Sequence, residues 1–263
     1  MDYRNVEFWH VLIGTFLRYF VFAGIAYLVF YVWKKSTWIR FKIQQVFPRE
    51  KAVRTELLYS LMTMFIFAAV IYGLLFTGFR DFTKIYTDIH EYPVTWFLIS
   101  LFIIIFLHDT YFYWTHRLMH WKKLFPFVHH IHHRSHNPTP LAAFSFHPLE
   151  ALIEIGILPI VAFTFPVHRG AIGVFGAYMI IMNVMGHLGY ELYPKWFLKN
   201  RISKWMNTST HHNMHHHYGK GNYGLYFNFW DRILGTNHPE YETRFNQVVE
   251  SRNRQIKEST AVH

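Results

Sequence analysis

The stretch Tyr111–His136, YFYWTHRLMHWKKLFPFVHHIHHRSH, decides how this chain is organised. Its clustered histidines form two groups by spacing: His116 with His120, and His129 with His132 and His133. The second spacing, His-x-x-His-His, returns further along the chain at His212, His215 and His216. On a helix, residues three or four apart share one face, so each group can present several imidazoles to a common point. The pattern therefore predicts a site for more than one metal ion.

The donor types narrow the chemistry of that site. The chain has no cysteine, which excludes disulfides, thiolate ligands and a cysteine nucleophile. Eight clustered histidines exceed the roughly four to six ligands that one ion takes, so we expect two ions. The one Glu-x-x-His match, Glu7 to His10, lies far from the clusters, and the zinc-peptidase motif His-Glu-x-x-His is absent. The pattern favours an oxygen-activating dinuclear centre over a hydrolase.

The composition is that of a membrane protein. Hydrophobic residues make up 52% of the chain and charged residues 16%, whereas a soluble globular protein carries about 25% charge. The formal net charge is +10, and such a basic excess is typical of the cytoplasmic loops of membrane proteins. The sequence contains no recognition module for nucleic acid, so we expect no nucleic-acid partner.

Three apolar runs are long enough to cross a bilayer: His10–Trp33, Leu57–Phe79 and Pro93–Trp114. The first run is too long for a cleaved signal peptide, and we expect it to be a retained anchor. Arg18 interrupts this run, and we expect its side chain to snorkel towards the nearer interface. The basic segment 34–54 predicts a cytoplasmic loop. The third run then delivers His116 and His120 just beyond its cytoplasmic end.

Two shorter apolar segments, Ala151–Val167 and Gly170–Gly186, are either short spans or a helical hairpin that enters the membrane partway. Under both interpretations the chain returns to the side of the membrane from which the first of these segments starts. We therefore predict an all-α, multi-pass integral membrane domain of four or five spans, with a cytoplasmic helical cap that holds the metal site. The predicted organisation is an N-terminal membrane anchor (1–92), a catalytic region (93–240) and a polar C-terminal tail (241–263).

Several short motifs occur in a specific order: His108-Asp109, Tyr113–Arg117, His129–His133, Asn137–Pro140, Phe146–Glu150, His211–His216, Gly221–Gly224 and Phe229–Arg232. In these motifs, between about Leu107 and His238, the chain resembles the fatty acid hydroxylase and sterol desaturase superfamily. The resemblance is closest to the sterol C5-desaturase (lathosterol oxidase) branch and its bacterial relatives.

The resemblance implies a non-haem di-iron site that activates O2 with two electrons from a separate carrier of the cytochrome b5 or ferredoxin type. It also implies nine metal ligands: His116, His120, His129, His132, His133, His187, His212, His215 and His216. His187 enters this set through the resemblance alone, because its spacing would also suit a residue at the membrane interface.

A metal-bound imidazole normally donates its other N–H group to an acceptor. The candidates near the motifs are Asp109, Glu150, Asn183, Asn213, Asn222 and Asp231, and we predict that Asp109, Asn222 and Asp231 serve the catalytic site. Some relatives carry a further histidine where this chain has Glu191, which leaves a ligand, a supporting acceptor or neither as its role. His147 either caps the helix that starts at Pro148, orients ligands or binds weakly, and we expect His136 in an exposed loop.

The implied function is the desaturation or hydroxylation of a C–H bond in a membrane lipid, most closely a sterol. Fatty acids, carotenoids and ether lipids are alternative substrates. A non-enzymatic membrane protein that binds zinc and a metal-dependent hydrolase are the competing classes. The predicted location is an integral membrane position with the site facing the cytoplasm, in the endoplasmic reticulum membrane of a eukaryote or the inner membrane of a bacterium.

Overall fold

The computed structural model describes residues 5–261, and their side chains as far as residue 258. Four helical segments are long and apolar enough to cross a membrane: Phe8–Trp33, Glu50–Leu75 (α4), Val94–Met119 (α5) and Arg169–Gly186 (α9). Only 22–28% of each segment's most apolar window is buried inside the protein, so most of its apolar surface is left for lipid. The prediction of an all-α, multi-pass membrane domain is confirmed.

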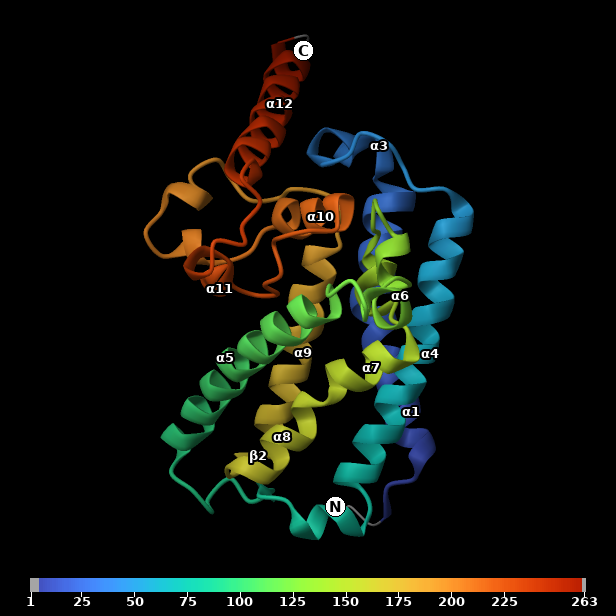
Figure 1. Ribbon diagram of the computed structural model, residues 1–263, viewed down its shortest axis with the longest axis vertical. Helices are drawn as coiled ribbons and strands as arrows, with labels where there is room; N and C mark the ends of the chain where they lie inside the picture. Colours follow the sequence, from blue (N-terminus) through green and yellow to red (C-terminus); the bar gives the residue numbers. More distant parts are fainter. Residues whose placement is uncertain (1–4, 262–263) are drawn as a thin grey trace.

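The first span is one continuous helix with two π-helical stretches. It runs through α1 (Phe8–Tyr19), η2 (Phe20–Gly24), α2 (Ile25–Tyr27) and η3 (Leu28–Trp33). It packs along α4 (Figure 1), and the core between these helices includes Tyr19, Met64, Phe67 and Phe144. The same core continues into Ala151 and Val184, so apolar residues of the predicted anchor and of the predicted catalytic region pack together. The domain boundaries themselves stay a prediction.

The two short apolar segments form a broken helix followed by a span. The break between α7 (Pro148–Ile155) and α8 (Ile157–Thr164) falls at Gly156, where an added Cβ would lie 2.7 Å from the Tyr111 hydroxyl oxygen. After α8, strand β2 (Val167–His168) pairs in parallel with β1 (Ile85–Tyr86), which belongs to the connection between α4 and α5. The connection from α8 to α9 therefore lies at the end of the bundle at which α4 and α5 are connected (Figure 1).

The opposite end carries short helices and the C-terminal region. The α-helices there are α3 (Lys35–Trp38), α6 (Phe125–Val128), α10 (Ser209–Tyr218), α11 (Phe229–Ile233) and α12 (Tyr241–Ala261). The 3-10 helices at this end are η4 (Ile39–Phe41), η6 (His132–Arg134), η7 (Pro140–Phe144), η8 (Phe197–Lys199) and η9 (Ser203–Trp205), whereas η5 (Gly78–Phe82) follows α4. Together the short helices and α10–α12 form a helical cap over the spans (Figure 1).

The structure adds to the sequence prediction at the end of the third span and in the C-terminal segment. The third span does not end at Trp114 but continues as α5 to Met119, so His116 lies inside the helix and His120 is its C-cap. The segment from Tyr241 is not merely a polar tail, because Tyr241, Phe245 and Val249 of α12 pack against Phe197, Leu198 and Met214. An apolar residue every fourth position buries one face of α12 and leaves the rest polar. Residues 262–263 lie outside the described part.

Candidate metal centre

All nine predicted ligands meet in two adjacent groups at the cap end of the bundle. The first group is His116, His120, His129, His133 and His215, and the second is His132, His187, His212 and His216. In each group, one donor atom per residue lies within 4.8 Å of the others. All nine side chains are buried except that of His120, which is partly exposed. Three separate parts of the chain thus converge on one centre.

Each His-x-x-His-His motif divides between the two groups. His129 and His133 join the first group, while His132 between them joins the second. On α10, His212 and His216 belong to the second group and His215 to the first. Residues four apart on a helix lie about 40° from each other, while the residue three after the first is turned about 60° from the first and about 100° from the last. The expectation that each motif serves one common point is therefore wrong: each motif serves both groups.

The ring nitrogens that face the protein define the tautomer of several histidines. Nδ1 lies 2.9 Å from the Asn183 carbonyl oxygen in His187, 2.8 Å from that of Tyr223 in His116, and 2.6 Å from that of Gly221 in His215. A carbonyl oxygen only accepts hydrogen bonds, so Nδ1 carries the proton in each of these rings. In a neutral imidazole, Nε2 then presents a lone pair.

These lone pairs point at one another. The Nε2 atoms of His116 and His129 are 3.1 Å apart, and the His129 Nδ1 lies 2.7 Å from the carboxylate of Glu150. Nδ1 of His116 donates to a carbonyl oxygen, so its Nε2 has no proton to share. When Glu150 is ionised, Nδ1 of His129 donates to the carboxylate, and Nε2 of His129 then has no proton either. A second such contact joins His187 to His132 at 3.3 Å. Two lone pairs at this distance repel unless a cation lies between them, so the donor set fits a metal ion in each group.

Burial keeps these imidazoles neutral. It lowers the pKa of His187 and His215 to about 4, and it lowers the pKa values of His129, His132, His212 and His216 well below the usual range. The neutral form is the one that binds a metal. The centre is therefore ready to accept cations at neutral pH.

The predicted supporting residues divide by what they contact. Glu150 accepts directly from a proposed ligand, His129. Asp109 instead accepts from the backbone N–H groups of Tyr226 and Phe227, and Asp231 accepts from those of Tyr223 and Gly224. Asn222 donates to the His211 carbonyl oxygen. Asp109, Asn222 and Asp231 thus hold loop 221–227, whose Gly221 and Tyr223 carbonyl oxygens orient His215 and His116, and do not themselves accept from a ligand ring.

The structure also gives the contacts of the other polar residues that the sequence singles out. Asn183 acts through its backbone carbonyl oxygen, and the Asn213 side chain accepts from Gln44. Glu191 belongs to neither group: its carboxylate accepts from the backbone N–H and the hydroxyl of Thr210 at the start of α10, and not from a proposed ligand ring. His147 caps α7 by accepting from the Leu149 N–H, and His136 is exposed as expected.

The carbonyl acceptors of Gly221, Tyr223 and Ser145 were not anticipated from the sequence. Every residue has a backbone carbonyl, so residue type gives no signal for this role.

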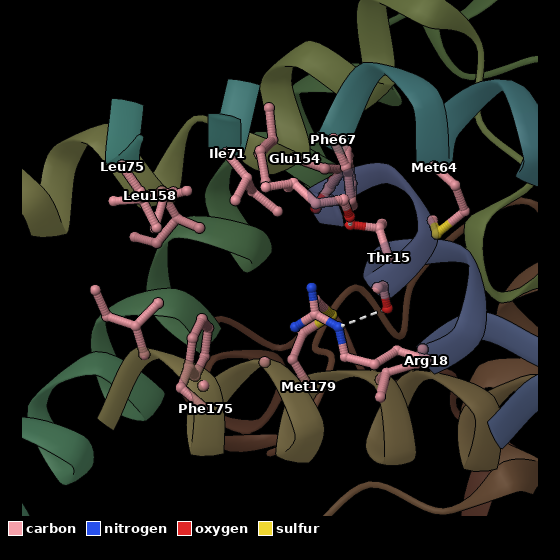
Figure 2. Close-up of a pocket in the computed structure, with 18 of the residues that line it drawn as sticks. Thr15, Arg18, Met64, Phe67, Ile71, Leu75, Glu154, Leu158, Phe175 and Met179 are labelled. Atoms are coloured by element: carbon pink, nitrogen blue, oxygen red, sulfur yellow. Dashed lines mark hydrogen bonds between the residues drawn. The ribbon is translucent and has the colours of Figure 1, made fainter. Parts of the chain in front are cut away.

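An apolar cavity of about 700 Å³ lies between the spans, and Figure 2 shows part of its lining. Its lining comes from α1, α4, α5 and α7–α9 and includes Met64, Phe67, Phe112, Phe146 and Met179. Two of these residues touch the centre, since the ring centroids of Phe146 and His132 are 5.2 Å apart and those of Phe112 and His116 are 4.9 Å apart. An apolar space lined in part by phenylalanine and methionine therefore lies beside the histidines.

Fold and site together define a membrane protein with a buried, all-nitrogen centre suited to two metal ions, open to an apolar cavity. The family model for fatty acid hydroxylase matches residues 101–236, just over half of the chain. This chain belongs to the fatty acid hydroxylase family, and it is accordingly an integral membrane oxidoreductase that acts on lipid.

Curated relatives extend the similarity beyond the matched region. Lathosterol oxidase of Rattus norvegicus is 29% identical over 232 residues, which cover 86% of this chain and 73% of the relative. Lathosterol oxidase of Homo sapiens is 28% identical over 229 residues, covering 85% and 72%. C-4 methylsterol oxidase of Schizosaccharomyces pombe is 32% identical over 160 residues, covering 58% and 52%. No solved structure matches the chain.

Proposed function

We propose that this protein uses O2 and two electrons to desaturate or hydroxylate a C–H bond of a sterol-like lipid, with two iron ions held by the nine histidines. The observation that carries the proposal is the convergence of Nε2 lone pairs, His116 on His129 and His132 on His187, beside an apolar cavity. In both reactions O2, two electrons and two protons are consumed. Desaturation removes two hydrogen atoms and releases two waters, whereas hydroxylation inserts one oxygen and releases one water.

Iron, when bound, supplies the reduction of O2 and the oxidation of the C–H bond. The protein's own part is positioning. Loop 221–227, held by Asp109 and Asp231, orients two ligand rings, and Glu150 orients a third. The apolar lining holds the lipid beside the centre and keeps bulk water away from it.

Other observations support the proposed substrate class, electron donor and location. The names of the relatives, lathosterol oxidase and C-4 methylsterol oxidase, favour a sterol-like substrate. The basic segment 34–54 lies at the same end of the bundle as the histidines (Figure 1), and its charge suits an acidic carrier of the cytochrome b5 or ferredoxin type. The positive-inside rule places this end in the cytoplasm, at the endoplasmic reticulum of a eukaryote or the inner membrane of a bacterium.

The test compares the wild type with His132→Ala after expression in a sterol-producing host. His136→Ala, which changes an exposed histidine outside both groups, is the matched control. Metal analysis and lipid mass spectrometry are measured on the same cultures. We expect two iron ions per chain and an O2-dependent product in the wild type and the control, and loss of at least one ion and of the product in His132→Ala. One zinc ion per chain without O2-dependent turnover would reject the proposal in favour of a zinc-binding protein.

Product formation without O2 or reductant would instead indicate a hydrolase. The product mass separates the two oxidations: a loss of two hydrogens indicates desaturation and a gain of one oxygen indicates hydroxylation.

A further inference from the structure

The side chains that line the apolar cavity between the spans include an arginine and a glutamate of particular interest. Arg18 comes from the first span and Glu154 from α7 (Figure 2). The sequence predicted that Arg18 would snorkel to an interface, but its guanidinium points into the cavity. Charged groups at this depth of a membrane are costly, and they are usually kept for a function.

Glu154 has no partner within the described residues. Its side chain is 7% exposed, and its carboxyl forms no hydrogen bond or ion pair with any residue in the range 5–258. The Glu154 side chain instead lines the cavity. A buried polar group without a hydrogen bond costs roughly 1–3 kcal/mol, so the fold alone gives no reason to place a carboxyl here.

Arg18 is held in place but is not neutralised. Its Nε donates to the Gly14 carbonyl oxygen at 3.4 Å, within its own helix. Its Nη1 lies close to α9, because a Cβ added at Gly176 would be 3.3 Å from this nitrogen. Among the described residues no carboxylate, Glu154 included, lies within ion-pair distance of Arg18. A cation and a carboxyl therefore line one cavity without pairing.

The chemical group that complements both side chains is a hydroxyl. A hydroxyl oxygen accepts a hydrogen bond and a hydroxyl hydrogen donates one. We propose that Arg18 donates to, and Glu154 accepts from, the hydroxyl group of a lipid alcohol whose apolar body fills the rest of the cavity. His10, Arg80 and Arg169 also line the cavity, and the two arginines add positive charge, so an anionic head group is the alternative that the sulfate probe below tests. A hydrocarbon would offer neither Arg18 nor Glu154 a hydrogen bond.

The residue that accepts from the hydroxyl shares a helix with a residue that contacts the metal centre. Glu154 follows Glu150 by one helical turn of α7, a rise of about 6 Å. Glu150 in turn contacts the proposed ligand His129 at 2.7 Å. This assignment deepens the proposed function by selecting a lipid alcohol over a free fatty acid or a carotene-like hydrocarbon, and it rests on that function for its reaction but not for its binding.

The experiment measures equilibrium binding of three radiolabelled probes to the full chain in detergent micelles: cholesterol, cholesteryl methyl ether and cholesteryl sulfate. The protein keeps its metals, but no electron donor is added, so no reaction takes place. We expect the wild type to bind the alcohol roughly tenfold more tightly than the ether, as for the one hydrogen bond to Glu154 that the ether cannot donate. Glu154→Leu should reduce this ratio to about twofold or less, whereas Arg18→Leu should weaken the binding of alcohol and ether alike, because both oxygens accept a hydrogen bond.

Two further variants keep the result interpretable. Glu154→Gln retains a hydrogen-bonding group and should retain most of the ratio, whereas Glu258→Leu, a change of an exposed carboxylate on α12, should leave it unchanged. Equal binding of alcohol and ether by the wild type would overturn the proposal, and so would an unchanged ratio in Glu154→Leu or an unchanged affinity for the alcohol in Arg18→Leu. Tighter binding of the sulfate than of the alcohol would assign the cavity to an anionic lipid instead. None of these readings depends on turnover, so an inactive protein that still prefers the alcohol would reject only the oxidoreductase function.

Discussion

At the scale of single residues, the centre depends on what each imidazole does with its second nitrogen. A carbonyl or carboxylate oxygen at Nδ1 holds the ring in one orientation and makes Nε2 the donor to a metal. In four of the ligand rings this acceptor lies within 3 Å, and in His129 it is the carboxylate of Glu150.

Glu150→Gln tests this role. The amide oxygen still accepts from Nδ1, but the negative charge is lost, so we expect the affinity of the first group for its metal and the activity to fall roughly tenfold or more. The measurement is metal content after dialysis against a graded chelator. Glu250→Gln, which disrupts an exposed ion pair with Lys195, is the control and should behave like the wild type. Equal metal retention in both variants would show that the charge of Glu150 has no role in binding.

A second prediction at this scale concerns Lys42, which is fully buried beside Tyr31 and Tyr190. Burial lowers its pKa from 10.5 to about 8. Between pH 8 and 10.5 the unfolded chain therefore holds a proton that the folded protein has lost, so the free energy of unfolding should rise with pH across this window, by at most about 3 kcal/mol. The measurement is thermal unfolding of the wild type and Lys42→Met at pH 7.5 and pH 10. A stability difference between the two proteins that does not change with pH would contradict the expectation.

At the scale of elements, the connection after α9 positions the second group. Gly189 follows His187 with a positive φ of 73°, a conformation that suits glycine. A Cβ at this position would collide with the Tyr31 hydroxyl and lie 3.1 Å from the Pro138 carbonyl oxygen. Tyr31 itself donates to the carbonyl oxygens of Pro138 and Leu188. The first span, the segment after the second histidine motif and the end of α9 therefore meet at one point.

Gly189→Ala should disturb this meeting point. We expect a loss of stability of about 1–3 kcal/mol from backbone strain, together with weaker metal binding by the group that contains His187. Gly73→Ala in α4 is the matched control, because an added Cβ there meets nothing within 4 Å, and the higher helix propensity of alanine should stabilise it by up to about 1 kcal/mol. Thermal unfolding and metal content are measured for both. A Gly189→Ala protein as stable and as metal-rich as the control would refute the expectation.

At the scale of the whole molecule, the first span, α5 and α9 each end at the cap (Figure 1). α5 delivers His116 and His120, α9 delivers His187, and the following segment folds back to place α10 over the spans (Figure 1). Between α5 and α9, the broken helix α7–α8 runs away from the cap, and it is followed by the β1–β2 pair. The histidines thus lie at one end of the bundle and the connection from α4 to α5 at the other.

This arrangement makes a topology prediction that is simple to test because the chain has no cysteine. Lys220→Cys places one exposed thiol beside α10 at the cap, and Asp88→Cys places one at the opposite end, before α5. In intact cells of a bacterial host, a membrane-impermeant maleimide should label Asp88→Cys directly and Lys220→Cys only after permeabilisation. The reverse pattern would place the histidines outside the cytoplasm.

The sequence by itself determined the fold class and the first three spans, and it indicated the histidines that we propose as ligands. Imidazole is a metal donor whatever its surroundings, and a bilayer of fixed thickness makes the length of an apolar run informative. Only the tertiary structure decided which histidine joins which group, because that division depends on residues far apart in the chain, such as His116 and His215. It also decided the carbonyl acceptors of Gly221 and Tyr223 and the placement of Arg18 and Glu154 in one cavity. Backbone carbonyls carry no signal in residue type, and two charged residues far apart in the chain do not reveal that they face the same space until the helices are packed.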